Sequence, residues 1–355
     1  MPQRLDALTN WLREVLNVES AGAQQTVDFQ LTPASTDASF RRYFRLQVSQ
    51  AQLAHLHMPQ RENPADSPVT LIAMDAPPDK EETTPFVRIA NLLVDIGLNA
   101  PRVLAQNTQQ GFLLLSDLGT QAYLDVLNED TVETLYADAL NALWLMQRDA
   151  PRDTLDGTIL LPLYDEPLLR REMALFSEWY CEKYCKLSFS TAQHSGLEAV
   201  FQQLCDAALA QPQVFVHRDY HSRNLMRVAE NNPGILDFQD AVIGPITYDL
   251  VSLLRDCYIA WPRARVERWA LDYLRHAADT DLIHRETDAT WLRWFDWMGV
   301  QRHLKAVGIF ARLYLRDGKA GYLNDIPRTL NYIRDVSARY PELQPLHALL
   351  DDLPQ

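Results

Sequence analysis

The sequence predicts an α+β protein with a small β-rich N-terminal lobe and a large helical C-terminal lobe. Short segments that alternate apolar and polar residues dominate the first third of the chain, and long segments with helical spacing follow from Leu124 onward. We expect the lobes to span residues 1–116 and 117–355, with Ser116-Asp117-Leu118-Gly119 as the hinge where the strand pattern breaks. A cleft between two lobes is a common place for a small-molecule site.

The first lobe is expected to contain one helix before its strands and one helix between them. The leucines of residues 4–17 recur at helical spacing, which predicts an amphipathic helix. Residues 27–31 and 42–48 alternate apolar and polar side chains and predict a hairpin with a polar connection. The remaining elements are strands at 69–74, 101–105 and 111–115 and a helix at 86–98.

The second lobe is expected to consist mainly of long helices. Short apolar segments at 214–216, 225–228 and 235–236 predict three strands, and the turn sequence N-N-P-G joins the last two into a hairpin. The segments with helical spacing are, approximately, residues 130–148, 166–186, 194–210, 247–259, 262–277, 288–316 and 325–338.

Charge and composition exclude several classes of protein. A net charge of −14 over 355 residues argues against a nucleic-acid partner. The chain has no stretch approaching the roughly 18 uncharged apolar residues of a spanning helix. Its N-terminus lacks the continuous apolar core of a signal peptide, so we expect a cytoplasmic protein without a membrane partner. The four cysteines lack the spacing of a zinc site and predict reduced thiols.

The most informative segment runs from residue 214 to residue 248 and contains His217-Arg218-Asp219. Asn224 follows the aspartate by five residues, and Asp237 follows the asparagine by thirteen. Phosphoryl transfer asks the protein for an acceptor of the hydroxyl proton and for ligands that hold a metal on the phosphates. Asp219 is the candidate proton acceptor, and His217 is expected to organise the loop by hydrogen bonds.

The predicted hairpin brings Asn224 and Asp237 to the same end. One amide oxygen and one carboxylate, together with phosphate oxygens, are the usual ligands of Mg²⁺. The sequence therefore predicts a kinase-like phosphotransferase that uses ATP and Mg²⁺. The alternative interpretation is that both residues only form polar turns, because Asp and Asn favour turns.

Residues 216–237, followed by Tyr248-Asp249-Leu250, resemble the aminoglycoside-phosphotransferase-like branch of the protein-kinase fold. This resemblance implies a two-lobe fold of that type and a supporting role for Asp249 beneath the catalytic loop. Further motifs resemble the N-acetylmuramate/N-acetylglucosamine kinases of bacterial cell-wall recycling, among them S-T-D-A-S-F-R-R-Y-F-R-L, L-L-L-S-D-L-G and M-G-V-Q-R-H-L-K-A-V-G-I-F-A-R-L. They imply transfer of the γ-phosphate of ATP to the anomeric C1 hydroxyl of these sugars.

The N-terminal lobe departs from the usual kinase pattern at the phosphate-covering turn, which has no glycine. Backbone N–H groups and hydroxyls can still cradle phosphate there, although an ordinary polar turn is the alternative. The candidate residues are Ser35, Thr36 and Ser39. If Phe40 points into the lobe, strict alternation places Arg42 and Phe44 on its side and Arg41, Tyr43 and Arg45 on the other.

A second departure is the missing lysine of the strand at 69–74, where Met74 stands near the expected position. We expect an arginine of the neighbouring strand to supply the positive charge, with Arg42 as the candidate and Arg41 or Arg45 as alternatives. The backbone groups of the hinge are expected to pair with the adenine edge. The hinge candidates are Ser116, Asp117 and Leu118.

The acceptor pocket is expected on the second lobe, near Asp219. Asp240 follows the metal-binding strand directly and is one candidate. In the predicted helix 166–186, Glu172 and Trp179 fall seven residues apart on one face and present an acid and an aromatic platform, although an ion-paired helix face and core packing are the alternatives. Arg302, with Lys305, is a candidate for a lactyl carboxylate, against a purely structural role.

Three hypotheses follow for the activity. The first is an ATP- and Mg²⁺-dependent kinase of small amino sugars. The second keeps the fold and changes the acceptor to another small hydroxyl compound, such as an aminoglycoside, choline or homoserine. The third is a nucleotide-binding pseudokinase scaffold, which the missing lysine and glycines suggest and the complete set of Asp219, Asn224 and Asp237 argues against.

Overall fold

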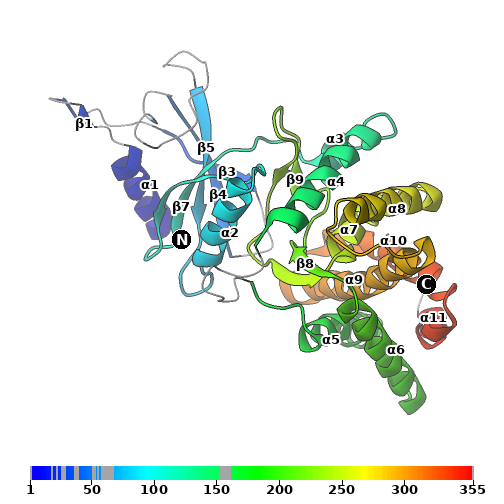
Figure 1. Cartoon of the computed structure of the whole chain (residues 1–355). Coiled ribbons are helices and arrows are strands. Elements are labelled where there is room, and N and C mark those ends of the chain that lie inside the picture. The colour runs from blue at the N-terminus through cyan, green and yellow to red at the C-terminus, as the bar shows by residue number, and fades with distance from the viewer. Residues whose placement is uncertain are drawn as a thin grey trace. The chain divides into compact units, whose positions relative to one another are not determined.

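The computed structural model describes residues 2–16, 19–20, 23–24, 29–35, 40–49, 53, 56, 68–151 and 161–353. The chain forms two compact units, shown with their elements in Figure 1. The first unit comprises Met1–Thr120 and Met226–Gln239, and the second comprises Gln121–Leu225 and Asp240–Gln355. The boundary thus lies at Thr120, four residues beyond the expected one, and the segment Met226–Gln239, which we expected in the second lobe, belongs to the first unit.

The first unit is built on an antiparallel sheet, which has five strands among the described residues, in the order β3–β4–β5–β7–β6. Phe112 to Leu115 are all buried, as expected for a strand covered on both faces. The sheet strands are β3 (Thr32–Ser35), β4 (Arg42–Ser49), β5 (Pro68–Asp75), β6 (Val103–Asn107) and β7 (Phe112–Ser116). Two further short strands, β1 (Glu19–Ser20) and β2 (Ala23–Gln24), pair with each other.

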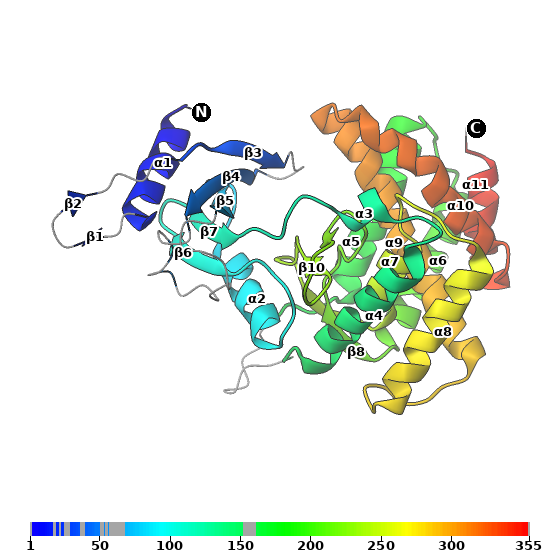
Figure 2. The same cartoon turned by 90° about the horizontal axis from the view of Figure 1, so that it is seen from above.

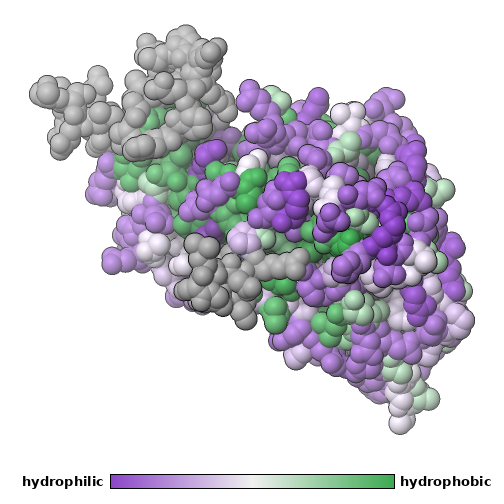
Figure 3. Space-filling model, in the orientation of Figure 1, coloured by the Kyte–Doolittle hydropathy of each residue, from purple (hydrophilic) through white to green (hydrophobic). Residues whose placement is uncertain are grey.

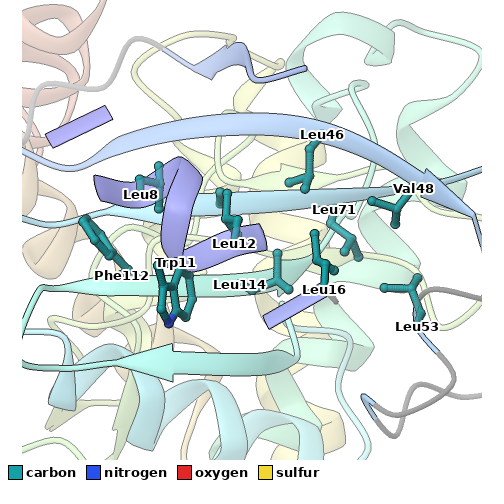
Figure 4. Packing of buried hydrophobic residues seen from close by; sticks show 11 residues of the cluster. Leu8, Trp11, Leu12, Leu16, Leu46, Val48, Leu53, Leu71, Phe112 and Leu114 are labelled. Atoms are coloured by element: carbon teal, nitrogen blue, oxygen red, sulfur yellow. The ribbon is translucent and has the colours of Figure 1, made fainter. Parts of the chain in front are cut away.

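Helices cover the two faces of this sheet, as Figure 2 shows. The apolar face of α1 (Pro2–Leu16) packs on alternate residues of the strands, which form a core with it (Figure 4). The core residues labelled there are Leu8, Trp11, Leu12, Leu16, Leu46, Val48, Leu53, Leu71, Phe112 and Leu114. On the other face lies α2 (Thr84–Asp95), which buries Phe86, Ile89, Ala90 and Leu93.

The segment Met226–Gln239 joins the first unit through a small hairpin. Strand β9 (Leu225–Met226) pairs with β10 (Gly234–Ile235), as the sequence predicts. The backbone N–H of Ile235 donates to the carbonyl of Asn99 at 2.8 Å, and the Asn99 amide donates to the carbonyl of Glu230 at 3.1 Å. Phe238 packs against Phe86 of α2, with 4.9 Å between ring centroids.

The second unit is helical and is organised around α9 (Asp288–Asp317), which packs against helices on several sides (Figure 1). Gly308 lets α9 approach α5 closely, because a Cβ there would lie 2.3 Å from the carbonyl carbon of Leu175. The other helices are α3 (Tyr123–Val126), α4 (Val132–Asp149), α5 (Glu166–Leu175), η2 (Phe176–Tyr184), α6 (Thr191–Leu209), α7 (Thr247–Leu254), α8 (Arg263–Asp279), η3 (Ala320–Asp325), α10 (Ile326–Ser337), η4 (Pro341–Leu343) and α11 (Gln344–Asp351).

Strand β8 (Gln213–Val216) pairs antiparallel with β11 (Val242–Pro245) inside the second unit. Both strands are buried almost throughout, and α7 begins two residues after β11. This arrangement places the loop that leaves β8 beside the start of α7. In the described part of the chain, none of the helices combines the length and the apolar character needed to cross a membrane. The face seen in Figure 3 is largely hydrophilic over the helical unit.

Two expectations about local structure were wrong. Strand β3 begins at Thr32, inside the segment expected to be a turn, and residues 29–31 are not a strand, while positions 27–28 lie outside the described residues. Phe40 is 64% exposed, so it does not point into the lobe as the strict alternation assumed. The regular strand β4 begins only at Arg42, and alternation therefore holds from that residue.

Candidate active site

The loop after β8 is held by a buried carboxylate. Asp249 of α7 accepts hydrogen bonds from the backbone N–H groups of His217, at 2.6 Å, and Arg218, at 3.0 Å. Arg218 has φ of 78°, in the left-handed region that non-glycine residues seldom adopt. The two bonds give Asp249 the supporting role expected of it, because they fix the backbone immediately before Asp219 in a conformation that it would otherwise leave.

A set of short-range bonds closes the loop around Asp219. The backbone N–H of Asp219 donates to Nδ1 of the buried His217 ring at 3.2 Å. The carbonyl of Asp219 accepts from the backbone N–H of His221 and from the Asn224 side-chain amide, both at 3.0 Å. His217 therefore organises the loop, and Asn224 is tied by its Nδ2 atom to the residue proposed as the base. The amide oxygen of Asn224 is the atom that suits a hard cation.

The electrostatics of the loop keep Asp219 ionised at neutral pH. Burial raises the pKa of Asp219, but the positive charge of Lys305, with those of Arg302 and Arg218, outweighs burial and holds this pKa below its ordinary value. The pKa of Asp249 is shifted in the opposite direction. Burial, with the negative charge of Asp219, raises the pKa of Asp249 to about 7 against the opposing effect of its two N–H donors.

Glu172 of α5 lies inside the second unit and binds the loop after β8 through Arg218. Its carboxylate pairs with Arg218 and accepts the hydroxyl of Tyr164, and Lys305 of α9 lies 3.2 Å from its Oε1 atom. Lys305 also donates to the hydroxyl of Tyr248 at 3.0 Å. The side chain of Glu172 is thus engaged by internal donors, which corrects the expectation that it presents an acid to a sugar.

Trp179 does not share the helical face that we expected. The α-helix ends at Leu175, and residues Phe176–Tyr184 continue it as a π-helix, in which bonds run from i to i+5 and α-helical spacing no longer defines a face. Trp179 is half-buried, with Lys183 Nζ 3.7 Å from its ring centroid. Phe176 is fully buried, so core packing is its role.

Arg302 of α9 is buried, with 5% of its surface exposed, and contacts the thiol of Cys257 at 3.6 Å. Its Nε atom has no hydrogen-bond acceptor among the described residues. Asp240 is exposed, and its backbone carbonyl accepts from the Arg218 guanidinium at 3.3 Å. The structure therefore gives Arg302 an interior position near Asp219 and gives Asp240 a backbone contact with the loop.

Asp237 also adopts the left-handed region, with φ of 63°. It follows β10 by two residues, and its Oδ1 accepts from the Gln239 side chain at 2.7 Å. A non-glycine residue is held there at a cost of roughly 1–3 kcal/mol, which marks the position as a candidate functional one. No group of three or more His, Cys, Asp or Glu side chains that suits a metal occurs in the described parts of the chain. The amide oxygen of Asn224 and the carboxylate of Asp237 are each oxygen donors of the kind that Mg²⁺ prefers.

The arginines of β4 each have an acidic partner. Arg42 pairs with the buried Asp75, which also binds Arg4 of α1. Arg42 therefore lies on the face of the sheet that α1 covers, and this position corrects its assignment to the nucleotide. Arg45 faces the opposite side and pairs with Asp117 of the hinge at 2.6 Å.

The hinge is ordered by its own hydrogen bonds. The backbone N–H of Ser116 donates to the carbonyl of Arg102 at 3.0 Å, so it is not the group that pairs with adenine. Burial raises the pKa of Asp117, but bonds from Arg45 and from the backbone N–H of Gly119 outweigh burial and lower it. The side chain of Leu118 packs over Gly234, where a Cβ atom would lie 3.0 Å from the Cδ1 atom of Leu118. Thr36 and Ser39 lie outside the described residues, and for Ser35 only the backbone, at the end of β3, is described.

Comparison with known proteins identifies relatives along nearly the whole chain. Residues 30–291 match the model of the phosphotransferase enzyme family. The N-acetylmuramate/N-acetylglucosamine kinase of Pseudomonas putida is 47% identical over 99% of this chain and 96% of its own length. The proteins of the same name from Pseudomonas aeruginosa and Neisseria meningitidis are 43% and 41% identical, over 99% of this chain and 97% and 96% of their own lengths.

Solved structures confirm the predicted fold. A choline kinase from Cryptosporidium parvum aligns with a TM-score of 0.60 at 10% identity, over 98% of this chain and 99% of its own. An ADP-bound aminoglycoside phosphotransferase aligns with a TM-score of 0.55 at 12% identity, over 92% of this chain and 97% of its own. At such identities the likeness concerns the fold alone, and it is the two-lobe, protein-kinase-like fold of the aminoglycoside phosphotransferases.

Proposed function

Because this chain belongs to the phosphotransferase enzyme family, we propose that it transfers the γ-phosphoryl group of ATP to the anomeric C1 hydroxyl of N-acetylmuramate and N-acetylglucosamine. The observation that carries the substrate assignment is the identity of 41–47%, along 99% of the chain, to kinases named for these two sugars. The free thiols of the described residues suit a cytoplasmic enzyme, where ATP is available and recycled cell-wall sugars arrive.

Asp219 is the proposed proton acceptor. The sugar oxygen forms its new bond to the γ-phosphorus while the bond from phosphorus to the β–γ bridging oxygen breaks, and the hydroxyl proton passes to the Asp219 carboxylate. The lowered pKa of Asp219 supports this role, since the group is ionised before the sugar binds. His217 and Asp249 do not touch the substrate in this proposal, because their contacts fix the loop backbone.

Asn224 and Asp237 are the residues that would hold Mg²⁺, the first through its amide oxygen and the second through its carboxylate. The ion, when bound, neutralises charge on the phosphate oxygens. The hydrogen bond from Asn224 to the carbonyl of Asp219 supports the proposal, because it links the orientation of the ligand to the position of the base. Arg45, next to the hinge, replaces Arg42 as our candidate for positive charge near the nucleotide.

The product identifies the acceptor and the hydroxyl together. The purified enzyme is incubated with ATP, Mg²⁺ and each sugar, and the product is examined by phosphorus-31 NMR. We expect a phosphate signal coupled to the anomeric proton. A product phosphorylated at C6 would contradict the anomeric assignment. If the enzyme phosphorylated only an aminoglycoside, choline or homoserine, that compound would be the acceptor instead of the sugars. If it consumed no ATP with any acceptor, the scaffold hypothesis would be favoured.

A further inference from the structure

Arg223 lies on the catalytic loop, four residues after Asp219 and directly before Asn224. The loop turns tightly here, because the backbone N–H of Asn224 donates to the carbonyl of His221 at 2.9 Å and the N–H of His221 donates to the carbonyl of Asp219. The side chain of Arg223 is 41% exposed. A cationic side chain is therefore presented to solvent within one short turn of the proposed base.

Aromatic rings, and not a close carboxylate, hold the Arg223 guanidinium. Its central carbon lies 3.5 Å from the ring centroid of Tyr258 and 5.8 Å from that of Tyr322 in η3. Tyr258 in turn packs edge-on against His221, with 5.3 Å between centroids. A guanidinium held over a ring keeps its N–H donors at its edge, where they suit a planar anion.

One carboxylate serves as the acidic partner of Arg223 and of a second arginine. The acidic partner of Arg223 is Asp325, at 3.8 Å, which is close to the limit for an ion pair. The same carboxylate pairs with Arg328 of α10 at 3.2 Å. In the described part of the chain, no other carboxylate lies within 4.0 Å of either arginine. Two guanidinium groups thus share one carboxylate on an accessible surface.

Two buried polar groups next to this surface also have unmet hydrogen-bonding capacity. Nδ1 of His221 and Nε of Arg302 have no hydrogen-bond partner among the described residues. Both side chains are buried, with 9% of His221 and 5% of Arg302 exposed. Native proteins pair nearly all such atoms, and the exceptions concentrate where a ligand or water completes the set. Arg302 contacts Cys257, whose backbone carbonyl accepts from Arg328 at 2.7 Å, so both groups border the surface that carries Arg223.

We infer that Arg223 binds the carboxylate that distinguishes N-acetylmuramate from N-acetylglucosamine, with Arg328 as the second cation of this site. The inference rests on the proposed function. N-acetylmuramate carries a lactyl carboxylate on its ring and N-acetylglucosamine carries none, so a residue that favours the acid sugar needs a free cationic edge close to the base. Arg223 stands four residues after Asp219 on the same loop and has only a distant carboxylate partner, at 3.8 Å. Lys305, which we had considered for the same carboxylate, is engaged by Glu172 and Tyr248.

The test is the ratio of kcat/KM for the two sugars in the full-length enzyme. In Arg223→Gln we expect this ratio to shift against N-acetylmuramate by about 10- to 100-fold, mainly through KM, because one charge-assisted hydrogen bond is lost. Arg223→Lys keeps the charge and should restore part of the preference. Arg316→Gln removes an exposed arginine that pairs with Asp317 at the C-terminal end of α9, and it should leave the ratio unchanged. Thermal melting checks that each variant is folded.

The outcomes separate the inference from the proposed function. If the wild-type enzyme phosphorylates both sugars and Arg223→Gln lowers both values of kcat/KM in proportion, or lowers neither, the carboxylate site is wrong and the kinase assignment stands. If the wild-type enzyme phosphorylates neither sugar, the proposed function falls and the inference falls with it. If Arg223→Gln lowers kcat/KM for N-acetylmuramate alone, the result supports both the carboxylate site and the kinase assignment.

Discussion

Removing the charge of Glu172 is predicted to be costly, because two buried cations depend on it. In Glu172→Gln the amide would face Arg218 and Lys305, which are 19% and 10% exposed, and could not neutralise either. Leaving buried charges without their partner costs about 3–5 kcal/mol of unfolding free energy. We expect a loss of this size in urea denaturation at pH 7.

The same substitution is predicted to slow catalysis, since Glu172 acts on the loop through Arg218. The backbone of Arg218 is in the left-handed region, and its guanidinium is fixed by this carboxylate. Freeing it would displace Asp219 from its productive position, and a displacement near 1 Å can lower the rate by about 10²-fold. We therefore expect kcat to fall by about that factor, while KM for ATP changes little.

The pH dependence of the effect follows from the direction of the pKa shift. Burial raises the pKa of Glu172, but Lys305, Arg218 and Tyr164 outweigh burial and hold it below its ordinary value. The carboxylate therefore stabilises the folded state above the unfolded pKa, about 4.3, and this stability is lost as the pH falls through the lower folded pKa. The difference in the free energy of unfolding between wild type and Glu172→Gln should therefore become smaller at acidic pH.

A matched control lies on the same helix. Glu166 pairs with Arg170 at 2.8 Å, and its side chain is 42% exposed, so Glu166→Gln should cost at most about 1 kcal/mol and leave kcat unchanged. If Glu172→Gln behaved like Glu166→Gln in both assays, Glu172 would not be the residue that positions the loop.

Three further predictions concern the base, its support and the helix contact. Asp219→Asn should lower kcat by about 10²–10⁴-fold with ATP binding nearly intact, as measured by ADP release and by nucleotide titration. Asp249→Asn should destabilise the protein by about 1–3 kcal/mol at low pH, since a buried N–H loses its acceptor. The raised pKa of Asp249, about 7, means that its protonated form stabilises the fold fully below pH of about 4. That stability declines toward pH 7 in the wild type and not in Asp249→Asn. If the free energy of unfolding, measured in urea, had the same pH dependence in both proteins, this prediction would be contradicted. Gly308→Ala places a Cβ 2.3 Å from the backbone of Leu175 and should cost about 1–3 kcal/mol, whereas Gly321→Ala, with open space around its Cβ, should cost much less in the same denaturation assay.

The sequence was most informative where the chemistry fixes residue types at short spacing. The loop from His217 to Asn224, the strand before it and the hairpin after it could all be predicted, because alternation and turn residues are local signals. Asp249 was placed through resemblance, since its bonds to the loop span more than thirty residues.

The interior partners could not be predicted from the sequence, because they depend on distant packing. The pairing of Arg42 with Asp75 and Arg4 brings together three segments, and periodicity does not encode such contacts. Trp179 was misassigned because nothing in the residue pattern indicates the change from α- to π-helix after Leu175. Arg223 had no recognisable signal, since its aromatic neighbours come from η3 and from the segment after α7.

The path of the chain between the units has a consequence for dissecting the protein. The chain passes from one unit to the other after Thr120, returns after Leu225 and passes again after Gln239. A fragment starting at Gln121 would carry Phe238 without its partner Phe86, and a fragment ending at Thr120 would lack the hairpin that bonds to Asn99. Neither unit is one continuous piece of sequence, so a single cut in the gene cannot yield two complete units.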